Sequence, residues 1–345
     1  MNLSKDLLLK FLRAVLFGEK LDAYDFAEAD WKSIFQLADE QTVSALLLDG
    51  MSLLPSECIT IPLGDKLKRI ATMQRIEQMN RLHRKVIVKI DQALKSEGIP
   101  VVFMKGQTTA LCYPNPLHRT PGDIDFVVNP KNFKKAMEVL EKKGKVDHDL
   151  VHEHHGMAWV DGVTVEPHYK VHNYQCPSTD HAMQEMLASV FPSELSSADM
   201  DGYAVPVFPP TFESVFLISH MVNHVYEEGL GLRQVIDYAM FLSSCADKID
   251  WLQHHEYLHQ MHMERAWRIF TCICVDYLGM SLPSQVESFS HQEKMWAEKM
   301  MTDIMRVGNF GRGEYVFHHR GFEDAFNNYC WVVKRCWNLG FVCPS

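Results

Sequence analysis

The stretch that decides the fold is VVFMKGQTTALCYPNPLHRTPGDIDFVV, residues 101–128. It begins as an apolar strand, turns at Lys105-Gly106 and ends in a second apolar strand that carries Asp123 and Asp125. Alternate residues of a strand point to the same side of a sheet, so the two carboxylates face one way while Ile124 faces the core. Two acids on a half-buried strand need a cation to neutralise them. The pattern therefore predicts a Mg²⁺ site.

Composition and charge narrow the class of protein. The chain has 345 residues, of which 47% are hydrophobic and 23% charged, and this is typical of a globular protein of two or three domains. Its net charge of -10 argues against binding of long nucleic acids. The nine cysteines lack any C-x-x-C pair, and the N-terminus predicts an amphipathic helix rather than a signal peptide. With no apolar run long enough for a membrane span, we expect a cytoplasmic protein.

Hydrophobic periodicity divides the chain into three regions. Residues 1–97 and 209–345 repeat at helical spacing, and residues 98–208 alternate short strands with short helices, which predicts an α+β fold. Asp65 and Thr211 are the expected caps of two helices, over 65–97 and from 211 onward. Asp161-Gly162 between two β-rich runs predicts a hairpin. Pro167 cannot donate to a ladder, so its strand is expected at an edge or with a bulge.

The carboxylates predict the chemistry. Asp123 and Asp125 can bridge two hard cations, which prefer oxygen ligands and bring phosphate oxygens with them. Glu166 shares a strand face with His168 and can complete the metal site and orient or deprotonate an acceptor hydroxyl. The alternative for Asp123 and Asp125 is that they are two solvated acids near the start of a strand. The alternative for Glu166 is a surface acid on an exposed face of the sheet. The pattern favours a site that binds a nucleoside triphosphate (NTP) together with two Mg²⁺ ions. Mn²⁺ could take the place of Mg²⁺.

Phosphate-binding candidates flank these acids. Lys105-Gly106 lies where a strand gives way to a helix, and glycine lets a phosphate approach the N–H groups there. Gly122 allows a similar close approach just before Asp123. Arg119 can clamp a phosphate as a planar fork; the alternative is an internal ion pair with one of the aspartates.

Histidines are frequent, at 18 in the chain, and five of them crowd the region of residues 152–172. They do not form a zinc-binding frame such as H-E-x-x-H, so HEHH is interpreted as a polar strand or loop, with a metal role as the alternative. His220 and His224 lie one helical turn apart and indicate a site or a buried hydrogen bond. Arg233 and Asp237 have the same spacing and can also pair with each other.

Several motifs occur here in the order found in one known family. KGQTTALCYPNPLHRTPGDIDFVV, then VEPHYKVH, then ISHMVNHVYEEGLGLRQVIDYAMFL resemble the uncharacterised bacterial nucleotidyltransferases of the polymerase-beta-like superfamily, over roughly residues 95–280. The resemblance implies a small mixed β-sheet core, here 98–208, between N-terminal and C-terminal helical regions, 1–97 and 209–345. It matches Glu166 to the third carboxylate, places His168 beside it, and matches His220, His224, Arg233 and Asp237 to the downstream helices. The Gly-Ser dipeptide usual in the superfamily is Gly106-Gln107 in this chain.

The combined expectation is a metal-dependent nucleotidyltransferase. Asp123, Asp125 and Glu166 would hold the metal, and Lys105, Gly106, Arg119 and Gly122 would bind the NTP. His168, His220, His224, Arg233 and Asp237 would contribute to the acceptor side. The acceptor would be a small molecule, a sugar or a protein with a free hydroxyl, and pyrophosphate would leave. Two alternatives stay open: a non-catalytic nucleotide-binding protein and a metal-dependent phosphohydrolase.

Overall fold

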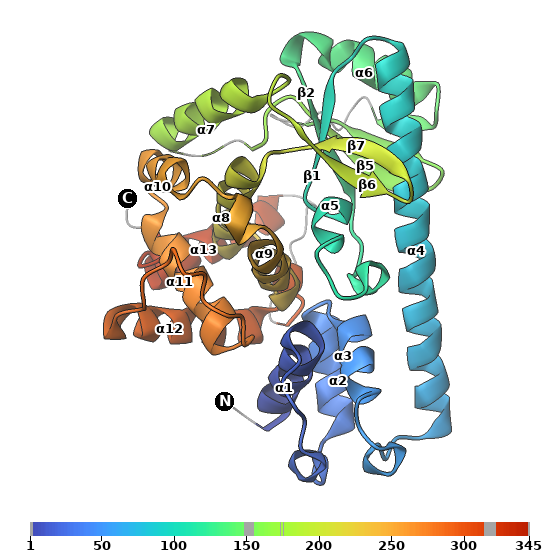
Figure 1. The fold of residues 1–345 in the computed structure, drawn as a ribbon, viewed down its shortest axis with the longest axis vertical. Helices are drawn as coiled ribbons and strands as arrows, with labels where there is room; N and C mark the ends of the chain where they lie inside the picture. The colour runs from blue at the N-terminus through green and yellow to red at the C-terminus, as the bar shows by residue number, and fades with distance from the viewer. Residues whose placement is uncertain (1–2, 148–154, 173, 175, 314–321, 344–345) are drawn as a thin grey trace.

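The computed structural model describes residues 3–147, 155–172, 174, 176–313 and 322–343. One sheet, built from the middle of the chain, has helices from both ends of the chain packed around it (Figure 1). This confirms the α+β class and the mixed sheet expected from the sequence. The division into three domains at residues 97 and 208 stays a prediction.

The sheet has seven strands in the order β3-β4-β5-β2-β1-β7-β6. Strand β1 is antiparallel to β2 and parallel to β7, and β2 is parallel to β5, so the sheet is mixed. The strands are β1 (Val101–Met104), β2 (Ile124–Val128), β3 (Lys145–Asp147), β4 (Met157–Val160), β5 (Val163–His168), β6 (Ser196–Met200) and β7 (Tyr203–Val207). The two strands of the opening stretch therefore lie at the centre of the sheet.

Both faces of the central strands are covered, because every residue of β1 and β2 is buried. Val101 and Phe103 pack in one apolar cluster with helices α4 (Leu63–Ser96) and α6 (Phe133–Glu141). Val102 and Met104 point the other way and join the larger cluster formed by the remaining helices. The alternation of strand side chains thus places helices on both sides of the sheet.

The hairpin predicted at Asp161-Gly162 is present between β4 and β5. Both residues have positive φ, 51° and 82°, which is what a two-residue turn of this kind requires. The expectation for Pro167 was wrong about the edge, because β5 lies inside the sheet between β4 and β2. Pro167 lies opposite Gly156, which precedes β4, and its carbonyl oxygen accepts a hydrogen bond from the Gly156 N–H, so the ladder loses only the N–H donor at the end of the pairing with β4.

The helices before the sheet are α1 (Leu3–Phe17), α2 (Trp31–Glu40), α3 (Ser44–Met51) and α4. Helix α4 spans 34 residues, running beside the sheet at one end and packing on α3 at the other (Figure 1). Its N-cap is Pro62, so the sequence placed the cap wrongly at Asp65, which lies in the first turn. The short helix α5 (Gln107–Ala110) follows β1 directly.

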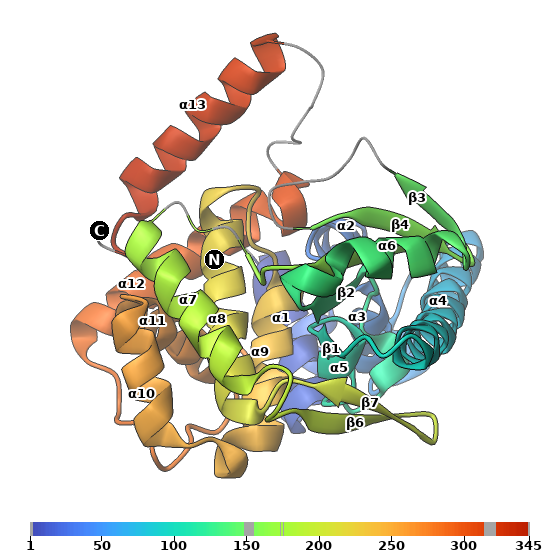
Figure 2. The same cartoon turned by 90° about the horizontal axis from the view of Figure 1, so that it is seen from above.

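The helices after β5 gather on the side of the molecule opposite α4 (Figure 2). They are α7 (Pro177–Val190), α8 (Pro210–Tyr226), α9 (Leu232–Cys245), α10 (Trp251–Gln260), α11 (Glu264–Asp276), α12 (His291–Val307) and α13 (Phe322–Leu339). Thr211 is not the cap of α8, since Pro209 occupies that position; the Thr211 Oγ1 instead accepts a hydrogen bond from the Asp250 N–H. Among the described residues, none of the helices combines the length and apolar character needed to cross a membrane.

Candidate functional site

Strand β1 ends in a sharp turn that places Lys105 at the site. Lys105 and Gly106 both have positive φ, 47° and 55°, so the chain reverses within two residues before α5 begins. The Lys105 N–H donates to Glu213 Oε1 of α8 at 3.3 Å, and the Lys105 Nζ lies 3.2 Å from Asp125 Oδ1. The turn therefore fixes the lysine between the sheet and α8.

Gln107 occupies the position where the superfamily usually has serine. Its side chain is buried, and its Nε2 donates to Asn80 Oδ1 of α4 at 2.6 Å. Gln107 thus ties α5 to α4.

Three carboxylates come together on one face of the sheet. Asp123 directly precedes β2, and Asp125 follows two residues later on the same face. Asp125 pairs in register with Glu166 on the parallel neighbour β5. One carboxylate oxygen from each of the three lies within 4.8 Å of the other two. The parallel pairing of β2 and β5 brings Glu166 to the two aspartates, although they lie more than 40 residues earlier in the sequence.

The charge of this cluster is concentrated. Burial, reinforced by the negative charges of Asp125 and Asp123, raises the pKa of Glu166 to about 8, although Lys105 opposes the shift. Burial alone would lower the pKa of Lys105, but Asp125, Asp123 and Glu166 outweigh it and raise that pKa. Carboxylates that destabilise one another in this way form a favourable environment for a cation.

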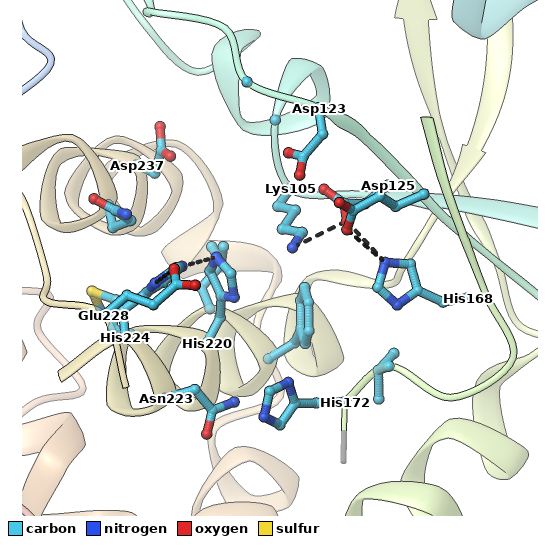
Figure 3. A pocket seen from close by; sticks show the side chains of 18 of the residues that line it. Lys105, Asp123, Asp125, His168, His172, His220, Asn223, His224, Glu228 and Asp237 are labelled. Atoms are coloured by element: carbon cyan, nitrogen blue, oxygen red, sulfur yellow. Dashed lines mark hydrogen bonds and ion pairs between the residues drawn. The ribbon is translucent and has the colours of Figure 1, made fainter. Parts of the chain in front are cut away.

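His168 adjoins the carboxylates from the end of β5. It is buried, and its Nε2 lies 2.9 Å from Asp125 Oδ1 and 3.9 Å from Glu166 Oε2. Figure 3 shows His168 and Lys105 reaching Asp125 from opposite sides. We refer to Lys105, Asp123, Asp125, Glu166 and His168 as the sheet wall.

Arg119 is held in a buried ion pair. Its Nε and Nη2 each donate to a different carboxylate oxygen of Asp237 at 2.7 Å, and the Tyr113 hydroxyl donates to the same carboxylate at 2.6 Å. The sequence left open an internal ion pair for Arg119; the structure contains one, with a partner from α9. Asp237 therefore pairs with Arg119 and not with Arg233, which the sequence had offered as its partner.

Arg233 occupies a different environment one turn earlier on α9. Its Nη1 donates to the Thr120 carbonyl at 3.3 Å, and its guanidinium carbon lies 6.0 Å from the centre of the Phe310 ring. Burial lowers the pKa of Arg233 to about 10, helped by the nearby positive charge of Arg119 and opposed by Asp237 and Asp123. Within the described residues its Nε is a buried donor without a hydrogen-bond partner.

His220 and His224 lie on α8, with their Nε2 atoms 3.1 Å apart. Burial, together with the positive charges of Lys105 and Arg233, lowers the pKa of His224 to about 3. Burial and Lys105 also lower the pKa of His220 well below its usual range. Both imidazoles are therefore neutral at pH 7. We refer to His220, His224, Arg233 and Asp237 as the helical wall.

A cleft of about 650 Å³ separates the two walls. All twelve residues proposed from the sequence line it, and Figure 3 shows the labelled side chains of α8 facing the carboxylates across it. Sequence reasoning did not find Asn223, Glu227 and Phe310, which also line the cleft, or Glu213, which holds the Lys105 backbone. An acid inside the apolar run TFESVFLISHM was the available signal for Glu213.

Two solved structures are similar to part of the chain. One is the solution structure of the antibiotic-resistance factor ANT(2'')-Ia, at 14% identity and a TM-score of 0.36, covering 52% of this chain and 97% of its own. The other is the crystal structure of an antigenic nucleotidyltransferase-like protein from Paracoccidioides brasiliensis, at 14% identity and a TM-score of 0.33, covering 54% of this chain and 91% of its own.

The chain matches no curated protein. It does match a family model described as an uncharacterised nucleotidyltransferase, over residues 27–279. That range includes the whole sheet, α8, α9 and the residues of both walls. The chain therefore belongs to this family of uncharacterised nucleotidyltransferases.

Proposed function

We propose that the protein transfers a nucleoside monophosphate from an NTP to a hydroxyl-bearing acceptor and releases pyrophosphate in a metal-dependent reaction. The observation that carries this proposal is the meeting of Asp123, Asp125 and Glu166, with ligand atoms within 4.8 Å of one another, in the wall of a cleft. The cleft volume lies in the range of pockets that bind small molecules.

The three carboxylates fit Mg²⁺. They offer only oxygen ligands, which this ion prefers, and the pKa of Glu166 is raised by burial and by the negative charges of its neighbours, which a cation would offset. Asp123, Asp125 and Glu166 would hold two Mg²⁺ ions, or Mn²⁺ instead. When bound, the metal supplies charge neutralisation at the phosphates and at the attacking oxygen.

The positive groups of the cleft bind the triphosphate. Lys105 provides a point charge on the sheet wall, and the partnerless Nε of Arg233 provides a directed donor on the helical wall. Gly106 and Gly122 leave room for phosphate oxygens near the backbone. Arg119 contributes indirectly, because its bidentate pair with Asp237 fixes the start of the stretch that leads to Asp123.

The helical wall suits a hydroxyl-bearing acceptor. His220, His224 and Asn223 present uncharged donors and acceptors of hydrogen bonds opposite the carboxylates (Figure 3). Glu166, ionised once a metal neutralises the cluster, would orient the acceptor hydroxyl and take its proton as the new phosphoester bond forms and pyrophosphate leaves. A small molecule, a sugar or a protein side chain can supply that hydroxyl, and ATP is one of the candidate donors.

The test is a screen for pyrophosphate release with the four NTPs and Mg²⁺ against a panel of small-molecule, sugar and protein acceptors. We expect pyrophosphate in proportion to nucleotidylated acceptor, and loss of both in Asp123→Ala and Asp125→Ala. Inorganic phosphate as the product would instead show a phosphohydrolase. NTP binding that neither substitution weakens, without pyrophosphate, would show a non-catalytic nucleotide-binding protein.

A further inference from the structure

We propose that His155, Glu166 and His168 form a second cation position, selective for a divalent transition-metal ion such as Mn²⁺ or Zn²⁺. It adjoins the oxygen-only position of Asp123 and Asp125 and shares Glu166 with it. The inference rests on the proposed function only through that shared carboxylate.

Strand register brings the three side chains together. His155 forms an isolated bridge with His168, so the two residues are direct cross-strand neighbours and their side chains lie on one face. Glu166 precedes His168 by two residues on β5 and shares that face. Two of the ligands therefore come from a strand inside the sheet, and a single bridge places His155, which precedes β4, opposite them.

The distances fit a single ion. Glu166 Oε2 lies 3.8 Å from His155 Nε2 and 3.9 Å from His168 Nε2, and the three ligand atoms are within 4.8 Å of one another. Ligands bound about 2.1 Å from a metal lie roughly 3 to 4 Å apart, depending on coordination number. His168 Nε2 is within hydrogen-bond distance of Asp125 Oδ1, at 2.9 Å, and a metal bound at this nitrogen would replace that hydrogen bond.

The ligand types set the preference of this position. Imidazole nitrogen is a ligand for transition metals, whereas Mg²⁺ takes oxygen ligands almost exclusively. The neighbouring group of Asp123, Asp125 and Glu166 has only oxygen ligands. The two positions should therefore differ in selectivity although a single carboxylate belongs to both. His155 and His168 are 13 positions apart, which explains why short metal motifs did not find them.

A rival role for the two imidazoles is to neutralise the carboxylates as protonated partners, without a metal. Their rings lie 5.0 Å apart, and two imidazolium groups at this separation would repel each other. The nitrogen coupling measured below separates the two roles, because a metal binds imidazole only in its neutral form.

The experiment uses full-length protein freed of metal with a chelator and titrated with Mn²⁺ alone. Pulsed electron paramagnetic resonance detects nitrogen coupled to bound Mn²⁺, and calorimetry measures Mn²⁺ and Mg²⁺ affinity. We expect nitrogen coupling in the wild type. His155→Gln should lower Mn²⁺ affinity at least about tenfold and change Mg²⁺ affinity less than about twofold. His181→Gln, at an exposed histidine of α7, is the matched control and should change neither.

A second variant keeps the test independent of folding. His155→Asp replaces the nitrogen by an oxygen ligand, so Mn²⁺ should still bind, with weaker nitrogen coupling and with better competition by Mg²⁺. Absence of nitrogen coupling in the wild type would overturn the proposal. So would equal loss of Mn²⁺ and Mg²⁺ binding in His155→Gln, because that result shows a structural role.

The two proposals fail separately. Asp123 belongs only to the oxygen position, so Asp123→Asn should weaken Mg²⁺ binding and leave the nitrogen coupling of Mn²⁺ intact. If no metal supports nucleotidyl transfer but the nitrogen coupling is present, the proposed function fails and the second cation position stands. If transfer proceeds with Mg²⁺ and nitrogen coupling is absent, the reverse holds.

Discussion

The sheet wall and the helical wall face the same cleft but are built on different principles. In the sheet wall, strand register places each side chain, and three carboxylates meet around Lys105. In the helical wall, packing of α8 and α9 places the side chains, and the groups are neutral histidines, a half-buried arginine and an aspartate already paired with Arg119. Only the sheet wall accumulates negative charge.

This difference indicates where catalysis and recognition reside. Charge held in excess by a rigid framework is suited to binding cations and to stabilising charge that develops during phosphoryl transfer. Neutral hydrogen-bonding groups on packed helices are suited to recognising an uncharged acceptor. The walls are joined at Glu213, whose side chain on α8 accepts from the backbone N–H of Lys105. Four substitutions test this division of roles.

The largest effect is expected for Asp125→Asn in the sheet wall. Asp125 contacts both Lys105 and His168 and belongs to the carboxylate group, so its loss should lower the rate of pyrophosphate release by about 10³-fold or more. Steady-state kinetics with the active NTP measures this. Asp161→Asn removes a carboxylate from an exposed turn, where it pairs with Lys89, and should leave the rate unchanged. Equal rates in the wild type and Asp125→Asn would refute the catalytic role of the sheet wall.

Arg119→Met should act mainly on stability. It leaves Asp237 buried without its cationic partner, which costs about 3 kcal/mol of unfolding free energy. Chemical denaturation measures the loss. The double variant Arg119→Met, Asp237→Asn removes the uncompensated charge and should recover at least half of the stability. If the double variant is less stable than Arg119→Met, the ion pair is not the source of the effect.

Glu213→Gln tests the contact between α8 and the Lys105 backbone through the pH dependence of the unfolding free energy. Burial raises the pKa of Glu213 to about 7 in the folded protein, against roughly 4.3 in the unfolded chain. The folded state thus binds the proton more tightly, and wild-type stability falls as pH rises from about 4.3 to about 7. The glutamine variant keeps an acceptor for Lys105 and should be more stable than the wild type by about 3 to 4 kcal/mol at pH 8.

The same comparison at pH 5 is the control for Glu213→Gln. At pH 5 the wild-type side chain is mostly protonated in the folded protein and only partly so in the unfolded chain, so the stability gap should shrink to about a third of its value at pH 8. Thermal denaturation at both values measures the difference. A gap that is the same at pH 5 and pH 8 would show that the charge of Glu213 is not responsible.

Arg233→Met is expected to have the smallest effect. Its one described hydrogen bond, to Thr120, is long at 3.3 Å, so unfolding free energy should change by less than about 1 kcal/mol. The Kd for the NTP should rise about tenfold, because a half-buried guanidinium would be lost from the phosphate site. Arg81→Met, on the exposed face of α4, is the matched control. NTP affinity that Arg233→Met leaves unchanged would remove Arg233 from the phosphate site.

Much of the fold could be predicted from local pattern. Apolar alternation marked β1 and β2, Asp161-Gly162 marked the hairpin, and helical spacing marked α4 over nearly its full length. The errors came from tertiary context. Pro167 favours an edge on its own chemistry, but the strand lies inside the sheet because its other residues pair with β2 and β4. Asp65 and Thr211 are good caps locally, yet prolines two or three residues earlier begin both helices.

The composition of the site was predictable, but its pairings were not. Alternation within the strand placed Asp123 and Asp125 together, and the motif order added Glu166. Whether Arg119 would face a phosphate or Asp237 depends on where α9 packs, which spacing within one segment does not encode. The same holds for His155, which meets His168 only through the pairing of two strands.

The most direct test of the central claim, that the sheet wall binds NTP through a metal, is calorimetry with a non-hydrolysable NTP analogue. Binding to the wild type and to Glu166→Gln is measured with Mg²⁺ and after its removal by a chelator. We predict that removing Mg²⁺ weakens binding to the wild type at least about tenfold, and that Glu166→Gln largely abolishes this dependence. Equally tight binding to the wild type with and without Mg²⁺ would contradict the account.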